Sequence, residues 1–208
     1  MPITDLFTYK DTVTKIQKRL PELFYIAELE CSRAGKVGME VGSTREKIII
    51  ALLIYRFGKE NIRSDISITE PEIDVIAFNY PISIKSITGN KLLGVKLIWT
   101  VDPEQAYRFS QIYSPHCDIL LVQVNWNNIG GLFYFTRAAQ IETLNSIGRE
   151  RYIKLPKVGT NPRGVEISAY ALYILVNHPT TFKIPINWIR EKIDYDPYDR
   201  WIDLWSKE

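Results

Sequence analysis

Asp74, Ser83 and Lys85 are the residues whose types and spacing could do chemistry in this chain. They lie in a predicted β-hairpin, and the side chains of a strand alternate between its two faces, so Ser83 and Lys85 share one face. With Asp74 on the neighbouring strand, about opposite Lys85, a carboxylate and an ammonium stand side by side. Such a pair is either a cross-strand ion pair or a site where a hard cation meets a phosphate.

The hairpin itself is predicted from two apolar runs, residues 73–78 and 82–87. Asn79 and Pro81 lie between them, and each favours a turn for a backbone reason of its own. We expect the turn to be centred near Asn79 and Tyr80. The isoleucines at the start of the second run then point to the opposite face, into a core.

Phosphodiester hydrolysis is the reaction that such a site could support. It needs a nucleophilic hydroxide, neutralisation of the charge on the phosphoryl oxygens, and help for the departing 3′ oxygen. Mg²⁺ provides most of this and keeps several of its waters, so one or two carboxylates and a substrate phosphate are enough around it.

The acid, the x-Lys dipeptide one strand later and the order of elements around them resemble the PD-(D/E)XK nuclease family, which includes type II restriction endonucleases. Asp74 and Lys85 match the motif of that family, and residues 86–89 follow it. The resemblance implies that Asp74 is the main Mg²⁺ ligand and that Lys85 orients the attacking water or stabilises the transition-state charge. Ser83 departs from the motif, because the family usually has Asp or Glu there.

A neutral serine oxygen holds a cation less strongly than a carboxylate, so another acid is expected at the metal. Some relatives with Ser-x-Lys recruit a glutamate from the following helix, which here is Glu104. Glu104 could instead be an exposed first-turn residue that pairs with Arg108 four positions later.

Many members of the family place a glutamate on the helix before the sheet, and the resemblance points to Glu46 for this role. Ser43 and Glu46 also have the spacing of a capping box, which is the alternative explanation. Glu72 shares the face of Asp74 by strand parity and is a third choice.

The family resemblance also implies a substrate, a partner and a product. The substrate is double-stranded DNA, and a palindromic site related by a two-fold axis suits a homodimer. The chain as a whole is similar to restriction endonucleases that cut a short CG-rich palindrome such as CGCG, leaving 5′-phosphate ends. Two alternatives stay open, namely a structure-selective or repair nuclease of the same fold, and a non-catalytic DNA-binding module.

Basic and loop residues in two stretches are the candidates for DNA contacts. A glycine-rich loop near residue 40 and a basic segment from residue 149 onward both allow close approach to phosphates. Met39, between glycines in the first loop, could wedge between base steps or pack under the loop. The full set of candidates is Lys36, Met39, Arg45, Lys47, Arg151, Lys154 and Arg163. A solvated charged surface is the alternative for each basic cluster.

The elements around the hairpin predict an α/β fold with three layers. We expect helices at residues 4–19, 21–33, 48–57, 103–113 and 166–177, and strands at residues 66–69, 73–78, 82–87, 95–101, 118–124 and 132–136. This order predicts a mixed central sheet with helices on both faces. The tail, residues 188–205, is expected to dock as an amphipathic segment.

Length and composition predict one globular domain. We expect the 208 residues to form one domain, and the family resemblance implies a nuclease domain with a helical part at about 1–58, a catalytic sheet core at about 59–136 and a DNA-binding and helical part at about 137–208. The net charge is only +2, so the distribution of charge decides whether nucleic acid can bind.

Cysteine spacing and the hydropathy of the chain further restrict the class of protein. Cys31 and Cys117 lack zinc-ligand spacing even with His116 beside the second, so we expect reduced, buried thiols. The first 30 residues contain no signal-peptide core, and no run is long enough to span a membrane. We therefore expect a cytoplasmic protein with no membrane partner.

Overall fold

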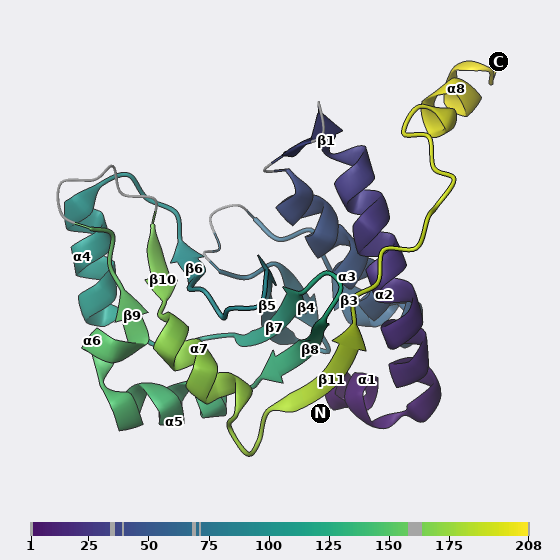
Figure 1. Ribbon diagram of the computed structural model, residues 1–208. Helices are drawn as coiled ribbons and strands as arrows, with labels where there is room; N and C mark the ends of the chain where they lie inside the picture. Colours follow the sequence, from purple (N-terminus) through teal and green to yellow (C-terminus); the bar gives the residue numbers. More distant parts are fainter. Residues whose placement is uncertain are drawn as a thin grey trace.

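A six-stranded mixed sheet runs through the middle of the computed structural model, which describes residues 2–33, 36–38, 40–67, 70, 72–157 and 164–207 (Figure 1). In spatial order its strands are β11 (Phe182–Asn187), β8 (Ile129–Phe135), β7 (Asp118–Val124), β5 (Tyr80–Thr88), β4 (Val75–Ala77) and β3 (Ile62–Arg63). Only β5 and β7 run parallel among these neighbouring pairs. Two smaller antiparallel sheets consist of β6 (Val95–Ile98), β10 (Val165–Ile167) and β9 (Ile153–Lys154), and of β1 (Ser32–Arg33) and β2 (Lys36–Val37).

Helices cover both faces of the central sheet, with α2 and α3 on one side and α4, α5 and α7 on the other (Figure 1). The α-helices are α1 (Asp5–Thr8), α2 (Lys10–Glu30), α3 (Val41–Phe57), α4 (Pro103–Ile112), α5 (Arg137–Ile147), α6 (Arg149–Tyr152), α7 (Ala169–Val176) and α8 (Asp199–Trp205). Short 3-10 turns lie at Pro2–Thr4 and Lys59–Asn61. Within the described part of the chain, no helix has the length and apolar character needed to cross a membrane.

Two hydrophobic cores lie on opposite faces of the sheet. Leu120 and Val122 of β7 pack with α2 and α3, whereas Ile119 and Leu121 pack with α4, α5 and α7. The alternation follows from the period of two along a strand, because both faces of β7 are covered. The predicted three-layer α/β fold is confirmed, and the predicted strand at residues 118–124 has the bounds of β7.

The turn of the β4–β5 hairpin lies one residue earlier than expected. Phe78 and Asn79 have φ angles of 51° and 66°, so both turn residues are left-handed, as the twist of a two-residue hairpin requires. Val75 pairs with Ile82, and Asp74 therefore lies beside Ser83 rather than opposite Lys85.

The N-terminal helices also differ from the prediction. Helix α2 continues through Pro21, where we expected one helix to end and another to begin. Leu20 and Phe24 are buried on either side of Pro21, and this packing outweighs the single hydrogen bond that a proline removes. Helix α3 begins at Val41 without a side-chain cap, so the predicted capping box of Ser43 is wrong.

Three further boundaries are corrected. The predicted helix at residues 166–177 starts later, because residues 165–167 form strand β10. Strand β8 begins at Ile129, three residues before the predicted start. Residues 66 and 67 lie outside any strand, and the rest of the predicted strand at 66–69 is outside the described residues.

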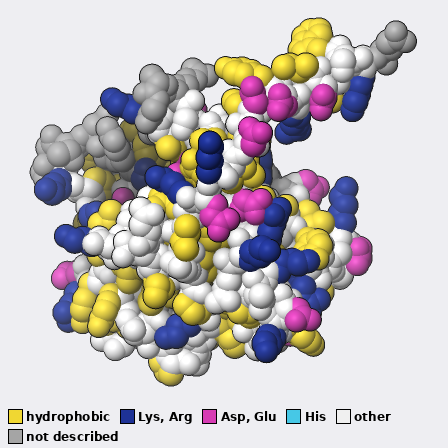
Figure 2. Space-filling model, turned by 45° about the vertical axis from the view of Figure 1, so that its right-hand side comes forward, with side chains coloured by type: hydrophobic (Ala, Val, Ile, Leu, Met, Phe, Trp, Pro, Cys, Tyr) yellow, Lys and Arg dark blue, Asp and Glu magenta, His cyan; other side chains and the backbone are white. Residues whose placement is uncertain are grey.

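The C-terminal tail is docked only at its beginning. Trp188 is fully buried beneath the sheet edge and joins the α2–α3 core. Beyond it the chain leaves the body, and α8 stands clear of the rest of the molecule (Figures 1 and 2). The expectation of a docked tail over residues 188–205 is therefore wrong for α8, which has no buried residue.

Candidate active site

The carboxylate of Asp74 is held by three groups of strand β5. Its Oδ2 accepts a hydrogen bond from the Ser83 hydroxyl at 3.1 Å and one from the Ile84 backbone N–H at 2.6 Å. The Nζ atom of Lys85 lies 3.5 Å from the same oxygen. The side chains of Asp74 and Lys85 are 20% and 21% exposed, whereas Ser83 is buried. The pair is thus fixed by the hairpin and still reached by solvent.

Glu46 belongs to the same electrostatic environment as this pair. It lies in the second turn of α3, and burial raises the pKa of its carboxyl. The negative charge of Asp74 raises that pKa further, while the ammonium of Lys85 opposes the shift. A helix before the sheet therefore contributes an acid beside the hairpin.

Glu72 is a third acid near the pair. Burial raises its pKa to about 8, with Lys85 opposing the shift and Asp74 adding to it. Its Oε1 atom is buried and has no hydrogen-bond partner among the described residues. The backbone at Glu72 has φ 70°, a left-handed conformation that turns the chain just before β4.

These three acids share one electrostatic environment and are the candidate ligands for a divalent cation. Asp74, Glu46 and Glu72 supply carboxylate oxygens, the ligands that Mg²⁺ prefers. Two observations support this role: burial and the negative charge of Asp74 raise the pKa values of Glu46 and Glu72, and one buried oxygen of Glu72 has no hydrogen-bond partner among the described residues. A bound cation would lower both pKa values and give the unpaired oxygen a partner.

The structure also brings Glu72 to His116 and Cys117. One ligand atom from each lies within 4.8 Å of the others. Thiol and imidazole are softer donors that suit Zn²⁺ better than Mg²⁺. Burial and the charge of Glu72 raise the pKa of the Cys117 thiol to about 12, so at neutral pH it is protonated and a weak ligand. Only Glu72 of this trio is therefore suited to a hard cation.

The two cysteines agree with the expectation from the sequence. Cys31 and Cys117 are both buried and free.

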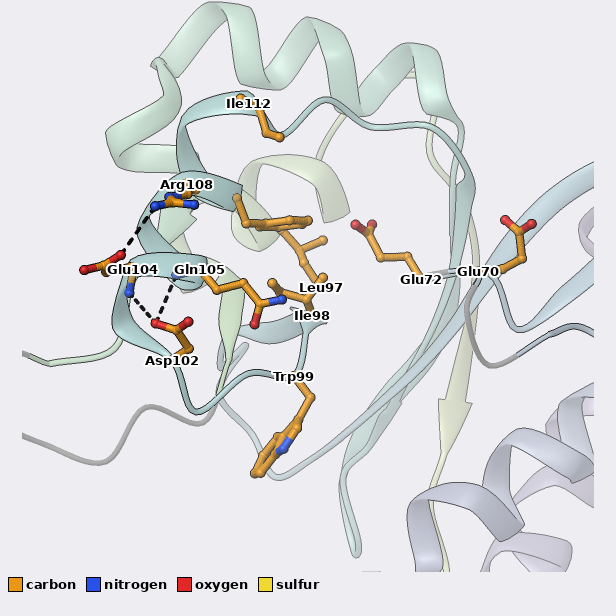
Figure 3. A pocket seen from close by; sticks show the side chains of 11 residues that line it. Glu70, Glu72, Leu97, Ile98, Trp99, Asp102, Glu104, Gln105, Arg108 and Ile112 are labelled. Atoms are coloured by element: carbon orange, nitrogen blue, oxygen red, sulfur yellow. Dashed lines mark hydrogen bonds and ion pairs between the residues drawn. The ribbon is translucent and has the colours of Figure 1, made fainter.

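A cavity of about 860 Å³ lies next to Glu72 (Figure 3). Glu70 and Glu72 form one wall, and residues of β6 and α4 form the other. Glu104 lies on this second wall and points away from Glu72, and its side chain is 81% exposed and pairs with Arg108 at 3.4 Å. The helix dipole and this i,i+4 pair explain Glu104 fully. Glu46 and Glu72 share the electrostatic environment of Asp74, whereas Glu104 lies on the opposite wall of the cavity, so the structure favours the first two as partners of Asp74 at a metal.

Arg45 is buried in an ion-pair network and does not face solvent. Its guanidinium donates to Glu28 Oε1 at 2.6 Å and to the Thr88 hydroxyl at 2.9 Å. Glu28 also accepts hydrogen bonds from Trp126 and Arg190. The side chains of Arg45 and Glu28 are each 6% exposed, so the expectation that Arg45 contacts DNA is corrected. Its interactions tie the start of α3 to the end of β5.

The other candidates for DNA contacts fall into two groups. Lys36, Lys47, Arg151 and Lys154 are exposed, although Arg151 lies over the ring of Tyr170. Lys154 forms an ion pair with Glu166 at 2.7 Å. Met39 and Arg163 lie outside the described residues.

Sequence reasoning missed Glu28 and the proximity of Glu72 to Cys117. Glu28 has no sequence signal, because its partners come from α3, the β7–β8 turn and the tail. The meeting of Glu72 with Cys117 depends on the parallel pairing of β5 with β7, which places the residue before β7 beside the β4–β5 hairpin.

Comparisons with known proteins found a matching family and a similar solved structure. The family model described as "Restriction endonuclease ThaI" matches residues 6–207. A solved structure described as "Restriction endonuclease in complex with substrate DNA" is 51% identical in sequence, with a TM-score of 0.92, and the match covers 99% of each chain. No curated protein sequence matches this chain.

Proposed function

Because this chain belongs to the restriction endonuclease ThaI family and is therefore a site-specific endonuclease, we propose that it cuts double-stranded DNA with Mg²⁺ at a centre built on Asp74 and Lys85. The observation that carries the proposal is the position of Lys85 Nζ, 3.5 Å from an Asp74 oxygen that two β5 groups hold in place. The side chains of this ion pair are about one-fifth exposed, so a phosphate and a cation can reach them.

Each residue of the centre has a separate task. Asp74, Glu46 and Glu72 would hold Mg²⁺, and Glu46 or Glu72 takes the place of the acid that Ser83 lacks. Bound Mg²⁺ would neutralise charge on the scissile phosphate and lower the pKa of a water molecule. Lys85 orients that water by hydrogen bonding and stabilises the charge that grows on the phosphoryl oxygens. Ser83 keeps the Asp74 carboxylate in one orientation.

The whole chain acts as one nuclease domain in this proposal. DNA lies against the exposed basic residues Lys36, Lys47, Arg151 and Lys154, whose contacts with phosphates would be sensitive to salt. Met39 and Arg163 remain candidates for contacts with bases or phosphates. The matched solved structure is a complex with substrate DNA, which supports duplex DNA as the substrate here.

The target is proposed to be a short CG-rich palindrome, CGCG, that two copies of the chain bind as a homodimer. A two-fold symmetric site presents the same contacts twice, so two identical subunits match it. Family membership favours this reading over a structure-selective nuclease or a non-catalytic module.

The test compares Asp74→Asn with Asp65→Asn, an exposed aspartate of the β3–β4 loop. Plasmid DNA is incubated with each protein and Mg²⁺, and the cut ends are sequenced. We expect wild type and Asp65→Asn to give discrete fragments with 5′-phosphates at one palindrome, and Asp74→Asn to give none. Cleavage by Asp74→Asn at the wild-type rate would show that Asp74 does not belong to the catalytic centre. A smear of fragments from wild type would show that the protein does not recognise a palindrome.

A further inference from the structure

Helix α8 is a short helix without any packing of its own. It has seven residues, and none of its side chains is buried. An isolated helix this short is unstable in water, because helices below about 12 residues lack enough hydrogen bonds to offset nucleation. We therefore expect a further surface to cover α8.

The uncovered side chains of α8 form one apolar face. Tyr198, Trp201, Ile202 and Trp205 follow the i, i+3, i+4, i+7 spacing that puts residues on one side of a helix. Their exposed fractions are 69%, 52%, 61% and 88%. Buried aromatic residues of this kind dominate the energetics of protein interfaces. Figure 2 shows apolar side chains on the part of the molecule that projects from the body.

The segment that carries α8, residues 191–207, is here called the C-terminal arm. Its base is fixed, because Trp188 is fully buried and Arg190 donates to Glu28 at 2.6 Å. From this base the chain runs away from the body (Figure 1). A segment that is anchored at its base and exposed at its end can contact another molecule.

The charge of the arm argues against DNA as its cover. The arm contains five acidic residues and three basic residues, and Asp199 and Asp203 lie together on one side of the apolar face of α8. DNA phosphates repel such a segment, since phosphate contacts come from basic side chains. A protein surface that combines apolar and basic residues fits better.

The groove between α2 and α3 has this composition. It has a volume of about 480 Å³ and is lined by Ile16, Leu20, Leu23, Ile48, Leu52 and Tyr55 together with Ala51. Lys15 and Arg19 line it too, and Lys15 lies over the ring of Tyr55. An amphipathic helix can lay its apolar face in such a groove.

We propose that α8 of one copy packs into the α2–α3 groove of a second copy, and that the second copy returns the same contact. Trp201 and Trp205 fill the apolar groove, and Asp199 and Asp203 face Lys15 and Arg19 across its edge. The contact is closed by a two-fold axis, as a symmetric dimer requires. This inference rests on the proposed homodimer and names the surface that forms it.

The first test measures mass in solution by light scattering over a range of protein concentrations. The variant Trp201→Ala/Trp205→Ala should dissociate into monomers at a concentration where wild type is dimeric, with a dimer on the order of 100-fold weaker. Tyr173→Ala, which removes another exposed aromatic residue from α7, should stay dimeric. An unchanged dimer in the tryptophan variant would overturn the inference.

The second test identifies the groove. Ala51→Glu adds bulk and a negative charge to an exposed position of the groove, so it should weaken the dimer as the tryptophan variant does. Chains with Trp205→Cys and chains with Ala51→Cys, mixed under oxidising conditions, should give a disulfide-linked pair of chains. A chain that carries both changes and cross-links only within itself would show α8 folding back, and would overturn the inference.

Two further outcomes separate this inference from the proposed function. Monomeric wild type at every concentration, with cleavage intact, would overturn the arm contact and the homodimer but leave the Asp74–Lys85 centre. Binding of wild type to neutral phosphatidylcholine vesicles, lost in Trp201→Ala/Trp205→Ala while both proteins stay dimeric, would assign α8 to a lipid surface and overturn the arm contact.

Discussion

The Ser83 hydroxyl donates a hydrogen bond to Asp74 Oδ2 at 3.1 Å, at the position where related nucleases usually have a second acid. A serine there cannot add a negative charge to the site, but its hydroxyl holds the Asp74 carboxylate in one orientation. In the proposed centre, the acids that replace it come from other elements, with Glu46 on α3 and Glu72 just before β4. The proposed centre thus combines a helix and a hairpin rather than two adjacent strands alone.

Ser83→Ala tests whether the Ser83 hydroxyl holds the Asp74 carboxylate in place. The change removes one buried hydrogen bond, so we expect a loss of about 1 kcal/mol in the free energy of unfolding. Urea denaturation of the metal-free protein measures it, with Ser146→Ala on the exposed side of α5 as the control. Equal stability of wild type and Ser83→Ala would show that the hydroxyl does not hold Asp74.

Glu46→Gln and Glu104→Gln distinguish the two glutamates that the sequence offered. Glu46 shares its environment with Asp74, so its loss should reduce cleavage by at least the roughly 10–100-fold that follows loss of a hydrogen-bond partner of a metal ligand. Glu104→Gln should cleave like wild type. Rates are measured against Mg²⁺ concentration, and a larger defect in Glu104→Gln would reverse the assignment.

Arg45→Met should act on stability rather than on DNA contacts. It breaks the buried pair with Glu28, and removing one partner of such a pair costs about 3–5 kcal/mol. Arg190 and Trp126 still hold Glu28, so we expect the lower end of this range.

Thermal unfolding measures this change, and the salt dependence of DNA binding provides the second readout. Lys47→Ala is the matched variant, because Lys47 is exposed two positions along the same helix. A normal melting temperature in Arg45→Met with weakened DNA binding would restore Arg45 as a DNA contact.

Glu72 should make the stability of the metal-free protein depend on pH. Its folded pKa is about 8, against an ordinary value of 4.5, so between these values the folded state keeps a proton that the unfolded state has lost. The stability that this group contributes is present below pH 4.5 and is lost as the pH rises to about 8.

The measurement is urea unfolding with a metal chelator at several pH values, for wild type and Glu72→Gln. We expect wild type to lose stability relative to Glu72→Gln as the pH increases through this window. Parallel curves for the two proteins would show that Glu72 is not held in a protonated form.

The parts of this structure that local sequence determines were predictable. Strand β7 is a continuous apolar run, and the acid and lysine of the hairpin stand out by type, so the layers and the Asp74–Lys85 pair followed from the sequence. The position of the hairpin turn depended on a left-handed Phe78, which side-chain type does not reveal because bulky residues rarely adopt that conformation.

Long-range partners account for the other differences. Arg45 resembles a surface cation until Glu28, 17 positions earlier, is placed beside it. Pro21 resembles a helix boundary until its neighbours are seen to pack in the core. Tertiary packing overrides local preference at both positions.

The most direct measurement is single-turnover cleavage by Lys85→Ala, with DNA binding measured in Ca²⁺ to separate affinity from chemistry. The control is Lys183→Ala on the exposed side of edge strand β11. We expect Lys85→Ala to bind the target DNA like wild type and to cleave it on the order of 100-fold more slowly or worse, as when one charge-stabilising group is removed from an active site. Cleavage by Lys85→Ala at the rate of Lys183→Ala would contradict the account, because the ammonium beside Asp74 would then have no part in the reaction.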